Sequence, residues 1–134
     1  MSENASSDAP PVISPDLRAS EPSAGEDAVY MLNALWLRPE GGEEAYRRYA
    51  AAVAPLLRKA GARVLPAYRP RETVIGHWDP DLFFLVEYPS WDAFQEMIRS
   101  PEYGEVRPLR QEALQKSLLI RCERSRVLES LAGG

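Results

Sequence analysis

Three polar side chains stand out as candidates for chemistry. Asn33 lies within the nearly apolar run VYMLNALWL, where an amide needs partners from the chain or from a ligand and could hold a substrate oxyanion. Arg110 can bind an anionic or enolate group with two parallel hydrogen bonds. His77 is the single histidine, and an imidazole suits proton transfer near neutral pH. These residues are our predicted catalytic set.

Each of the three also has a structural interpretation. Asn33 would bond to its own backbone surroundings. Arg110 would form an ion pair with Glu87 or Glu112, and a surface pair of this kind contributes little to stability. His77 precedes a Trp-Asp-Pro turn and would be an exposed loop residue. The sequence leaves both interpretations open.

Aromatic residues could complete a site by lining a flat, apolar pocket for an aromatic ligand. Trp36, Tyr68, Trp78 and Tyr103 are the predicted substrate-binding residues. Aromatic residues at such spacings also occur in plain cores and in dimer interfaces. We therefore expect only two or three of them to reach a pocket.

Composition limits the other possibilities. The chain has one Cys, Cys122, and one His, which excludes a multi-cysteine or two-histidine metal site. We expect no cofactor and no metal. No apolar run approaches the ~18 residues of a membrane span, and the N-terminus does not resemble a secretory signal. A cytoplasmic protein without a membrane partner is the expectation.

The charge of the chain divides it into segments. Residues 1–28 hold six acidic side chains and one basic one, whereas residues 29–134 hold fourteen and fifteen. The first segment is rich in Pro and Ser and lacks aromatic residues, so we predict a disordered acidic tail. Residues 29–124 form the predicted domain, and residues 125–134 a flexible C-terminal tail. A nearly neutral domain argues against nucleic acid as a partner.

The periodicity of apolar residues predicts the elements that position these candidates. We expect strands at 29–37, 63–69 with a continuation at 73–77, 82–88 and 118–124. A helix follows the first strand, from Glu43 to about Ala60. Ser90 begins a second helix, and Ser100 with Pro101 begins a third, which we expect to break near Pro108 and to resume over 110–116.

The resulting order is β-α-β-β-α-β, with the second helical segment broken in two. It predicts an α+β, ferredoxin-like fold, an antiparallel sheet with its helices on one face. The other face of the sheet is apolar and has nothing in the chain to cover it. We therefore predict a two-fold homodimer in which the open sheet faces pack together.

The segment from Leu82 to Tyr103 carries most of a family resemblance. The matching residues are Val86-Glu87-Tyr88-Pro89-Ser90, Phe94, Met97, Ser100-Pro101-Glu102-Tyr103, and Arg110 with Ala113-Leu114 and Ser117; earlier in the chain they are Met31-Leu32-Asn33, Tyr49, Val53-Ala54-Pro55-Leu56-Leu57, Gly61-Ala62-Arg63-Val64, Val74-Ile75-Gly76 and Trp78-Asp79. The chain thus resembles the bacterial domain-of-unknown-function family thirteen-thirty over about residues 29–120. That family lies in the dimeric α/β-barrel superfamily.

The resemblance implies a barrel-like dimer but no established activity. The superfamily includes cofactor-free monooxygenases, muconolactone-type isomerases, haem proteins and effector domains of transcription regulators. Relatives carry a His before the arginine that corresponds to Arg110, where this chain has Leu109. We expect a small-molecule-binding protein, either a cofactor-independent monooxygenase or isomerase acting on an aromatic, polyketide-like substrate, or a non-catalytic ligand-binding or protein-interaction module.

Overall fold

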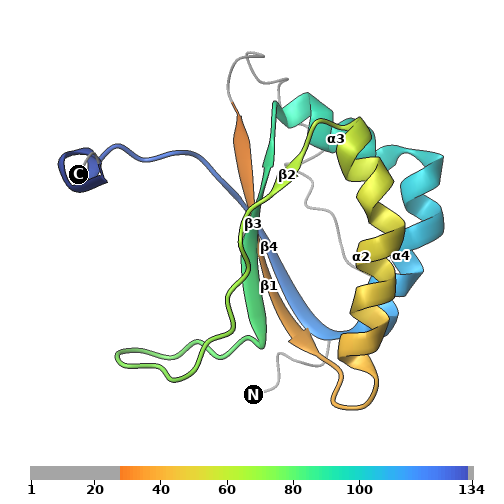
Figure 1. Cartoon of the computed structure of the whole chain (residues 1–134), viewed down its shortest axis with the longest axis horizontal. Coiled ribbons are helices and arrows are strands. Elements are labelled where there is room, and N and C mark those ends of the chain that lie inside the picture. The colour runs from red at the N-terminus through yellow and green to blue at the C-terminus, as the bar shows by residue number, and fades with distance from the viewer. Residues whose placement is uncertain (1–27, 133–134) are drawn as a thin grey trace.

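The computed structural model describes residues 28–132 and contains two layers, a four-stranded antiparallel sheet and the helices that cover one of its faces (Figure 1). The elements are β1 (Val29–Leu37), α2 (Gly42–Lys59), β2 (Arg63–Val64), β3 (Leu82–Tyr88), α3 (Trp91–Arg99), α4 (Pro101–Ala113), β4 (Leu114–Cys122) and α5 (Glu129–Ala132). The strand order is β2-β3-β1-β4. This topology confirms the predicted ferredoxin-like fold. The acidic tail predicted for residues 1–28 lies outside the described residues, apart from Ala28.

Local sequence signals explain where the helices begin and end. α2 follows Gly41, which has a φ of 80°, and carries Glu43 and Glu44 in its first turn, where negative charge favours the helix. Ser90 Oγ accepts a hydrogen bond from the Ala93 amide at 3.1 Å and begins α3. Ser100 caps α4 in the same way through the Tyr103 amide. The predicted caps are therefore confirmed.

The predicted strand at 63–69 is wrong in its extent. Only Arg63 and Val64 pair as a strand, and the ladder to β3 then continues through single contacts. The Leu65 amide donates to the Leu85 carbonyl at 2.9 Å, and Tyr68 exchanges two bonds with Phe83. Pro66 and Pro70 lack the N–H groups that a regular ladder needs. The predicted continuation at 73–77 is an exposed loop.

The end of the domain also differs from the prediction. α4 runs past Pro108 and stops at Ala113, although an interior proline removes a backbone donor and commonly kinks or breaks a helix. The predicted break is therefore wrong. β4 begins four residues earlier than expected, at Leu114, and ends at Cys122. Leu114 pairs with Leu37, so β4 follows the whole length of β1, with one register shift near Trp36. The C-terminal segment, predicted to be a flexible tail, contains the one-turn helix α5.

The two faces of the sheet have different surroundings. Val29, Met31 and Leu35 of β1 point toward the helices and are buried. The alternate residues, Tyr30, Leu32, Ala34 and Trp36, lie on the opposite, open face. We call this second surface the open face. It is formed by Tyr30, Leu32, Ala34 and Trp36 of β1, Phe83, Leu85 and Glu87 of β3, and Lys116, Leu118, Ile120 and Cys122 of β4.

The apolar core beneath the helices consists of two clusters. The larger one joins α2, α3 and α4 to β1 and β3, and includes Trp91, Phe94 and Tyr49. The smaller one surrounds Leu35 and Ala113 at the other end of the sheet. Tyr46 and Phe84 pack against both clusters.

Candidate functional site

Arg110 is a buried cation between the helices and the sheet. It lies in the last turn of α4, and only 9% of it is exposed. Its Nη2 atom is buried and has no hydrogen-bond partner within residues 28–132. Every Asp and Glu of these residues is exposed except Glu87, which is partly buried. The guanidinium therefore has no buried carboxylate beside it in the described part of the chain.

Tyrosine side chains surround this cation, and we call the group formed by Arg110, Tyr46, Tyr49, Tyr88 and Tyr103 the arginine–tyrosine cluster. The Tyr49 and Tyr103 hydroxyls share a hydrogen bond of 3.1 Å, and the Tyr46 and Tyr49 rings are 5.3 Å apart. Burial raises the pKa of Tyr46, and the charge and hydrogen bond of Arg110 partly oppose that shift. Burial also raises the pKa values of Tyr49 and Tyr88. These three phenols stay protonated at neutral pH.

Asn33 is on the same side of the sheet as this cluster. It is 8% exposed and lies on β1 between Met31 of one core cluster and Leu35 of the other. Its Nδ2 donates to the Met31 carbonyl at 3.3 Å, a long bond to a neighbouring residue. Directly opposite on β3 is Phe84, which touches both clusters. The predicted residues Asn33, Arg110 and Tyr103 thus all lie in the interior beneath the helices.

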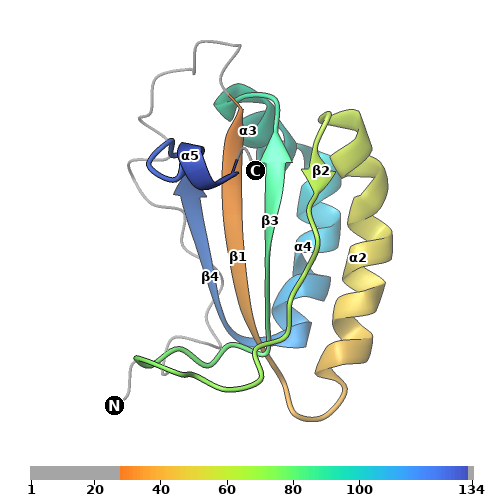
Figure 2. The same cartoon turned by 60° about the vertical axis from the view of Figure 1, so that its left-hand side comes forward.

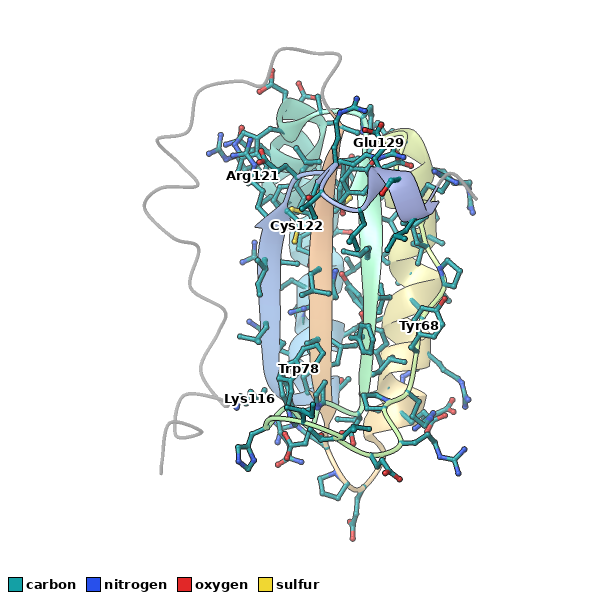
Figure 3. All side chains as sticks on the ribbon, turned by 90° about the vertical axis from the view of Figure 1, so that its left-hand side faces the viewer. Tyr68, Trp78, Lys116, Arg121, Cys122 and Glu129 are labelled. Atoms are coloured by element: carbon teal, nitrogen blue, oxygen red, sulfur yellow. The ribbon has the colours of Figure 1, made fainter. Side chains whose placement is uncertain are left out.

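The remaining predicted residues lie elsewhere. His77 is exposed, in the loop before β3. Trp36 is on the open face, with its Nε1 bonded to Asp79 at 3.0 Å. Trp78 and Tyr68 pack against Phe83 of the open face, at ring distances of 5.4 and 5.9 Å, and Figure 3 looks onto this surface. The sheet separates these aromatic residues from the interior, so the seven residues do not form one site.

The ion pairs considered for Arg110 are not made. Glu87 lies on the open face, where Arg63 contacts it at 2.7 Å and the Tyr30 hydroxyl donates to it at 3.1 Å. Glu112 is exposed, and its backbone carbonyl accepts a bond from Arg38. The structural interpretation of Arg110 as half of a salt bridge is therefore wrong within the described residues.

The relationship of the chain to known proteins agrees with this fold. The profile of a family described as "Domain of unknown function (DUF1330)" matches residues 41–122. The chain belongs to the DUF1330 family. The resemblance seen in the sequence is thereby confirmed. No curated protein matches the chain.

Solved structures similar to this DUF1330 chain include a protein of unknown function, RPA0582 from Rhodopseudomonas palustris. It is 34% identical with a TM-score of 0.74, and the match covers 82% of this chain and 89% of that one. A putative antibiotic biosynthesis monooxygenase from Bacteroides thetaiotaomicron is 20% identical with a TM-score of 0.57, over 75% and 92%. A dimeric protein of unknown function and ferredoxin-like fold from Bacteroides fragilis is 13% identical with a TM-score of 0.53, over 72% and 96%. The last two similarities show the fold.

The sequence pattern did not single out three tyrosines of the DUF1330 interior, Tyr46, Tyr49 and Tyr88, as polar groups. Tyr46 and Tyr49 occupy apolar positions of the α2 pattern and Tyr88 ends an apolar strand, so all three look like plain core. A buried tyrosine hydroxyl still needs a hydrogen-bond partner. Four tyrosines at core positions were therefore a signal that this interior is polar in part.

The other surface features of residues 28–132 are weaker candidates for a binding site than the arginine–tyrosine cluster. An open depression of about 700 Å³ lies where β1 meets α2. Its charged groups include both signs, and some of them bond within the protein: Glu43 pairs with Arg47, and Asp81 accepts from the Leu37 amide. No three His, Cys, Asp or Glu residues among 28–132 are arranged to hold a metal. None of the helices in this range has the length and apolar character needed to cross a membrane.

Glu87 makes the stability of the DUF1330 domain dependent on acid pH. Hydrogen bonds from Arg63 and Tyr30 hold its pKa below the ordinary value of 4.5. Since the folded pKa is lower than the unfolded one, this stabilisation is present above pH 4.5 and is lost as the pH falls through the folded pKa. We expect Glu87→Gln to have a shallower loss of melting temperature between pH 5 and pH 3 than the wild type. Equal slopes in calorimetric scans would contradict this.

Proposed function

We propose that this DUF1330 protein binds a small, largely apolar molecule between the sheet and helices α2 and α4. The observation that carries the proposal is Arg110, a buried guanidinium with an unbonded Nη2 atom. Buried donors that the protein leaves without partners are uncommon and costly. A ligand oxygen at Nη2 would satisfy this group, with the Tyr46 hydroxyl as a further donor and the Asn33 amide on the same side of the sheet. The proposal includes the predicted cytoplasmic location.

We also propose that two copies associate through the open face. Leu118 and Ile120 of β4 are exposed there, and Leu32, Phe83 and Leu85 are only partly buried. An apolar surface of this kind marks an interaction site. The similar protein from Bacteroides fragilis is described as dimeric. A second copy of the same sheet is the simplest partner, because a two-fold interface pairs the same apolar surface of both subunits.

Two projecting segments support a partner on this side. The loop before β3 and the C-terminal segment with α5 both extend from the side of the sheet opposite the helices (Figures 1 and 2). Their apolar side chains are exposed, with Ile75 at 91% and Leu131 at 74%. In the proposed dimer, these segments would reach around the edges of the partner sheet and bury those side chains.

A cofactor-independent oxygenase or isomerase is the second candidate. Its support is the similarity to a structure described as a putative antibiotic biosynthesis monooxygenase, together with donors suited to a substrate oxyanion. His77 is too exposed and too far along the loop to be the base of an interior site. The phenols, being protonated, would donate rather than accept protons. Such a reaction would therefore act on a substrate that ionises readily by itself.

Mapping of a bound probe tests the binding proposal. We would titrate the dimer with 1-naphthol and follow backbone amide and side-chain signals by NMR. We expect the shifts to concentrate on β1, α2 and α4 around Asn33, Tyr46 and Arg110, and to weaken in Tyr46→Phe but not in Tyr68→Phe. Shifts confined to Trp36, Tyr68 and Trp78 would place the ligand on the open face instead.

Turnover tests the enzymatic alternative. Oxygen consumption with a naphthalene hydroquinone would be measured for the wild type and for Asn33→Ala. In an oxygenase, loss of one oxyanion donor lowers turnover by about 10²-fold or more. Equal turnover of the two proteins would remove Asn33 from the reaction, and no consumption above the uncatalysed rate would exclude an oxygenase acting on this substrate.

A further inference from the structure

We infer that the ligand of this interior site is a monoanionic organic acid, a carboxylate, enolate or phenolate on an apolar ring, whose acidic oxygen pairs with Arg110. This inference rests on the proposed binding function and specifies the charge and class of the ligand. It follows from the electrostatics of the buried guanidinium, from its polar neighbours and from the apolar walls around them.

The charge of Arg110 is not balanced by the protein. A guanidinium stays charged in proteins, and an ion removed from water loses several kcal/mol of hydration, even after the protein relaxes, unless an opposite charge or good hydrogen bonds compensate. The exposed acids of α4 and the paired Glu87 of the open face do not provide that charge. The carboxyl end of α4, where Arg110 lies, offsets only part of the loss.

The neighbours of Arg110 are neutral donors. The Tyr46 hydroxyl interacts with its guanidinium, and burial keeps this phenol protonated by raising its pKa. The hydroxyls of Tyr49 and Tyr103 bond to each other, and the Asn33 amide N–H is directed to its own strand. Nη2 carries two N–H groups and leaves both unused within the described residues. An oxygen anion is the group that would accept from Nη2 and from a phenol at once.

The surroundings limit the size and charge of that anion. One buried cation balances one negative charge, so a phosphate monoester, which carries nearly two at neutral pH, would keep an excess. The core side chains in this part of the interior include the Tyr46, Tyr49 and Phe84 rings and Met31. Aromatic and aliphatic walls favour a ring or a short chain behind the acidic group. The class that fits is therefore an apolar acid with a single charge.

A matched pair of probes tests the charge. Binding of 1-naphthoate and of the neutral, similarly shaped 1-naphthamide would be measured by calorimetry in a chloride-free buffer. We expect the wild type to bind naphthoate at least about tenfold more tightly, as for other buried charge pairs. Arg110→Met should abolish this preference, and Arg48→Met, which removes an exposed arginine of α2, should preserve it.

The stability of the ligand-free protein gives an independent readout. An unbalanced buried charge destabilises the fold, so Tyr46→Phe/Arg110→Met should melt at a temperature about 4 °C or more above that of Tyr46→Phe alone. The Tyr46→Phe background is used because removal of Arg110 alone would leave the buried Tyr46 hydroxyl without that partner. A lower melting temperature would show that Arg110 is a structural group and would overturn the inference.

The outcomes separate the two proposals. If naphthoate and naphthamide bind equally and both shift the signals of the interior, the inference fails and the binding function stands. If neither probe binds and loss of Arg110 lowers the melting temperature, both fail. A naphthoate preference that survives Arg110→Met places the anion on another cation and also overturns the inference.

Discussion

Replacing Leu85 by glutamate is expected to convert the proposed homodimer into monomers. Leu85 lies in the middle of β3 on the open face, paired with Leu32 of β1. In a two-fold interface, the substitution would bury two carboxylates without partners, each at a cost of several kcal/mol. The dissociation constant should rise by about 10³-fold or more. Sedimentation velocity at micromolar concentration measures the change directly.

A control substitution separates this effect from a general effect of charge. Ala51 is exposed on α2, on the far side of the molecule from the open face. Ala51→Glu adds the same carboxylate and should leave the dimer intact. The far-ultraviolet circular dichroism spectrum of Leu85→Glu should match that of the wild type, which would show that the protomer still folds. If Leu85→Glu sediments as a dimer, the open face is not the interface.

Gly42→Ala is expected to lower the free energy of unfolding by about 2–3 kcal/mol, the range of overpacked interiors. Gly42 begins α2 where that helix meets the ends of β1 and α4. A Cβ atom there would lie 2.9 Å from the Ala113 carbonyl oxygen and 3.2 Å from Leu37. The Ala113 oxygen already accepts a bond from the Arg38 amide at 3.0 Å. The backbone at Gly42 or at these neighbours must therefore move. This shift would disturb the contacts of α2 with the end of β1 and with the end of α4.

The same substitution at Gly104 provides a control of opposite sign. Gly104 lies within α4, away from its ends, and is exposed to solvent. A Cβ atom added there would meet nothing within 4 Å. Gly104→Ala should stabilise the protein by up to about 1 kcal/mol through helix propensity and a less flexible unfolded chain. Urea denaturation would measure both variants. A loss at Gly42 no larger than 0.5 kcal/mol, in the ~±0.5 kcal/mol range of surface substitutions, would contradict the close approach.

The parts of the fold that were predicted well are those in which local signals agree. β1 and β3 are mostly apolar runs, and α3 has a serine cap at its start and a second capping serine at its end. The segment from Arg63 to Asp81 was predicted poorly because its prolines and β-branched residues favour opposite structures. The path of this segment is set by the backbone hydrogen bonds of Leu65 with Leu85 and of Tyr68 with Phe83. Such long-range contacts are not visible in local composition.

The candidate site was predictable only in part. Asn33 and Arg110 could be chosen because a polar residue stands out in an apolar pattern. Trp36 could have been separated from Asn33 at once, since residues three apart on a strand point to opposite faces. Tyr68 and Trp78 could not be placed, because they belong to a loop whose position depends on packing against Phe83. That no carboxylate of the described residues lies beside the buried Arg110 is likewise a property of tertiary structure.

The two outer edges of the sheet expose the chain to aggregation very differently. On one side β2 is two residues long and Pro66 and Pro70 follow it, so this edge cannot template a foreign strand. On the other side β4 is a regular nine-residue strand, and Leu119 at its centre is 49% exposed. Lys116 and Arg121 place one charge near each end of that edge, but its centre from Leu118 to Ile120 is apolar. Intermolecular strand pairing under heat or crowding would therefore begin at β4, and Leu119→Lys is the substitution that would suppress it.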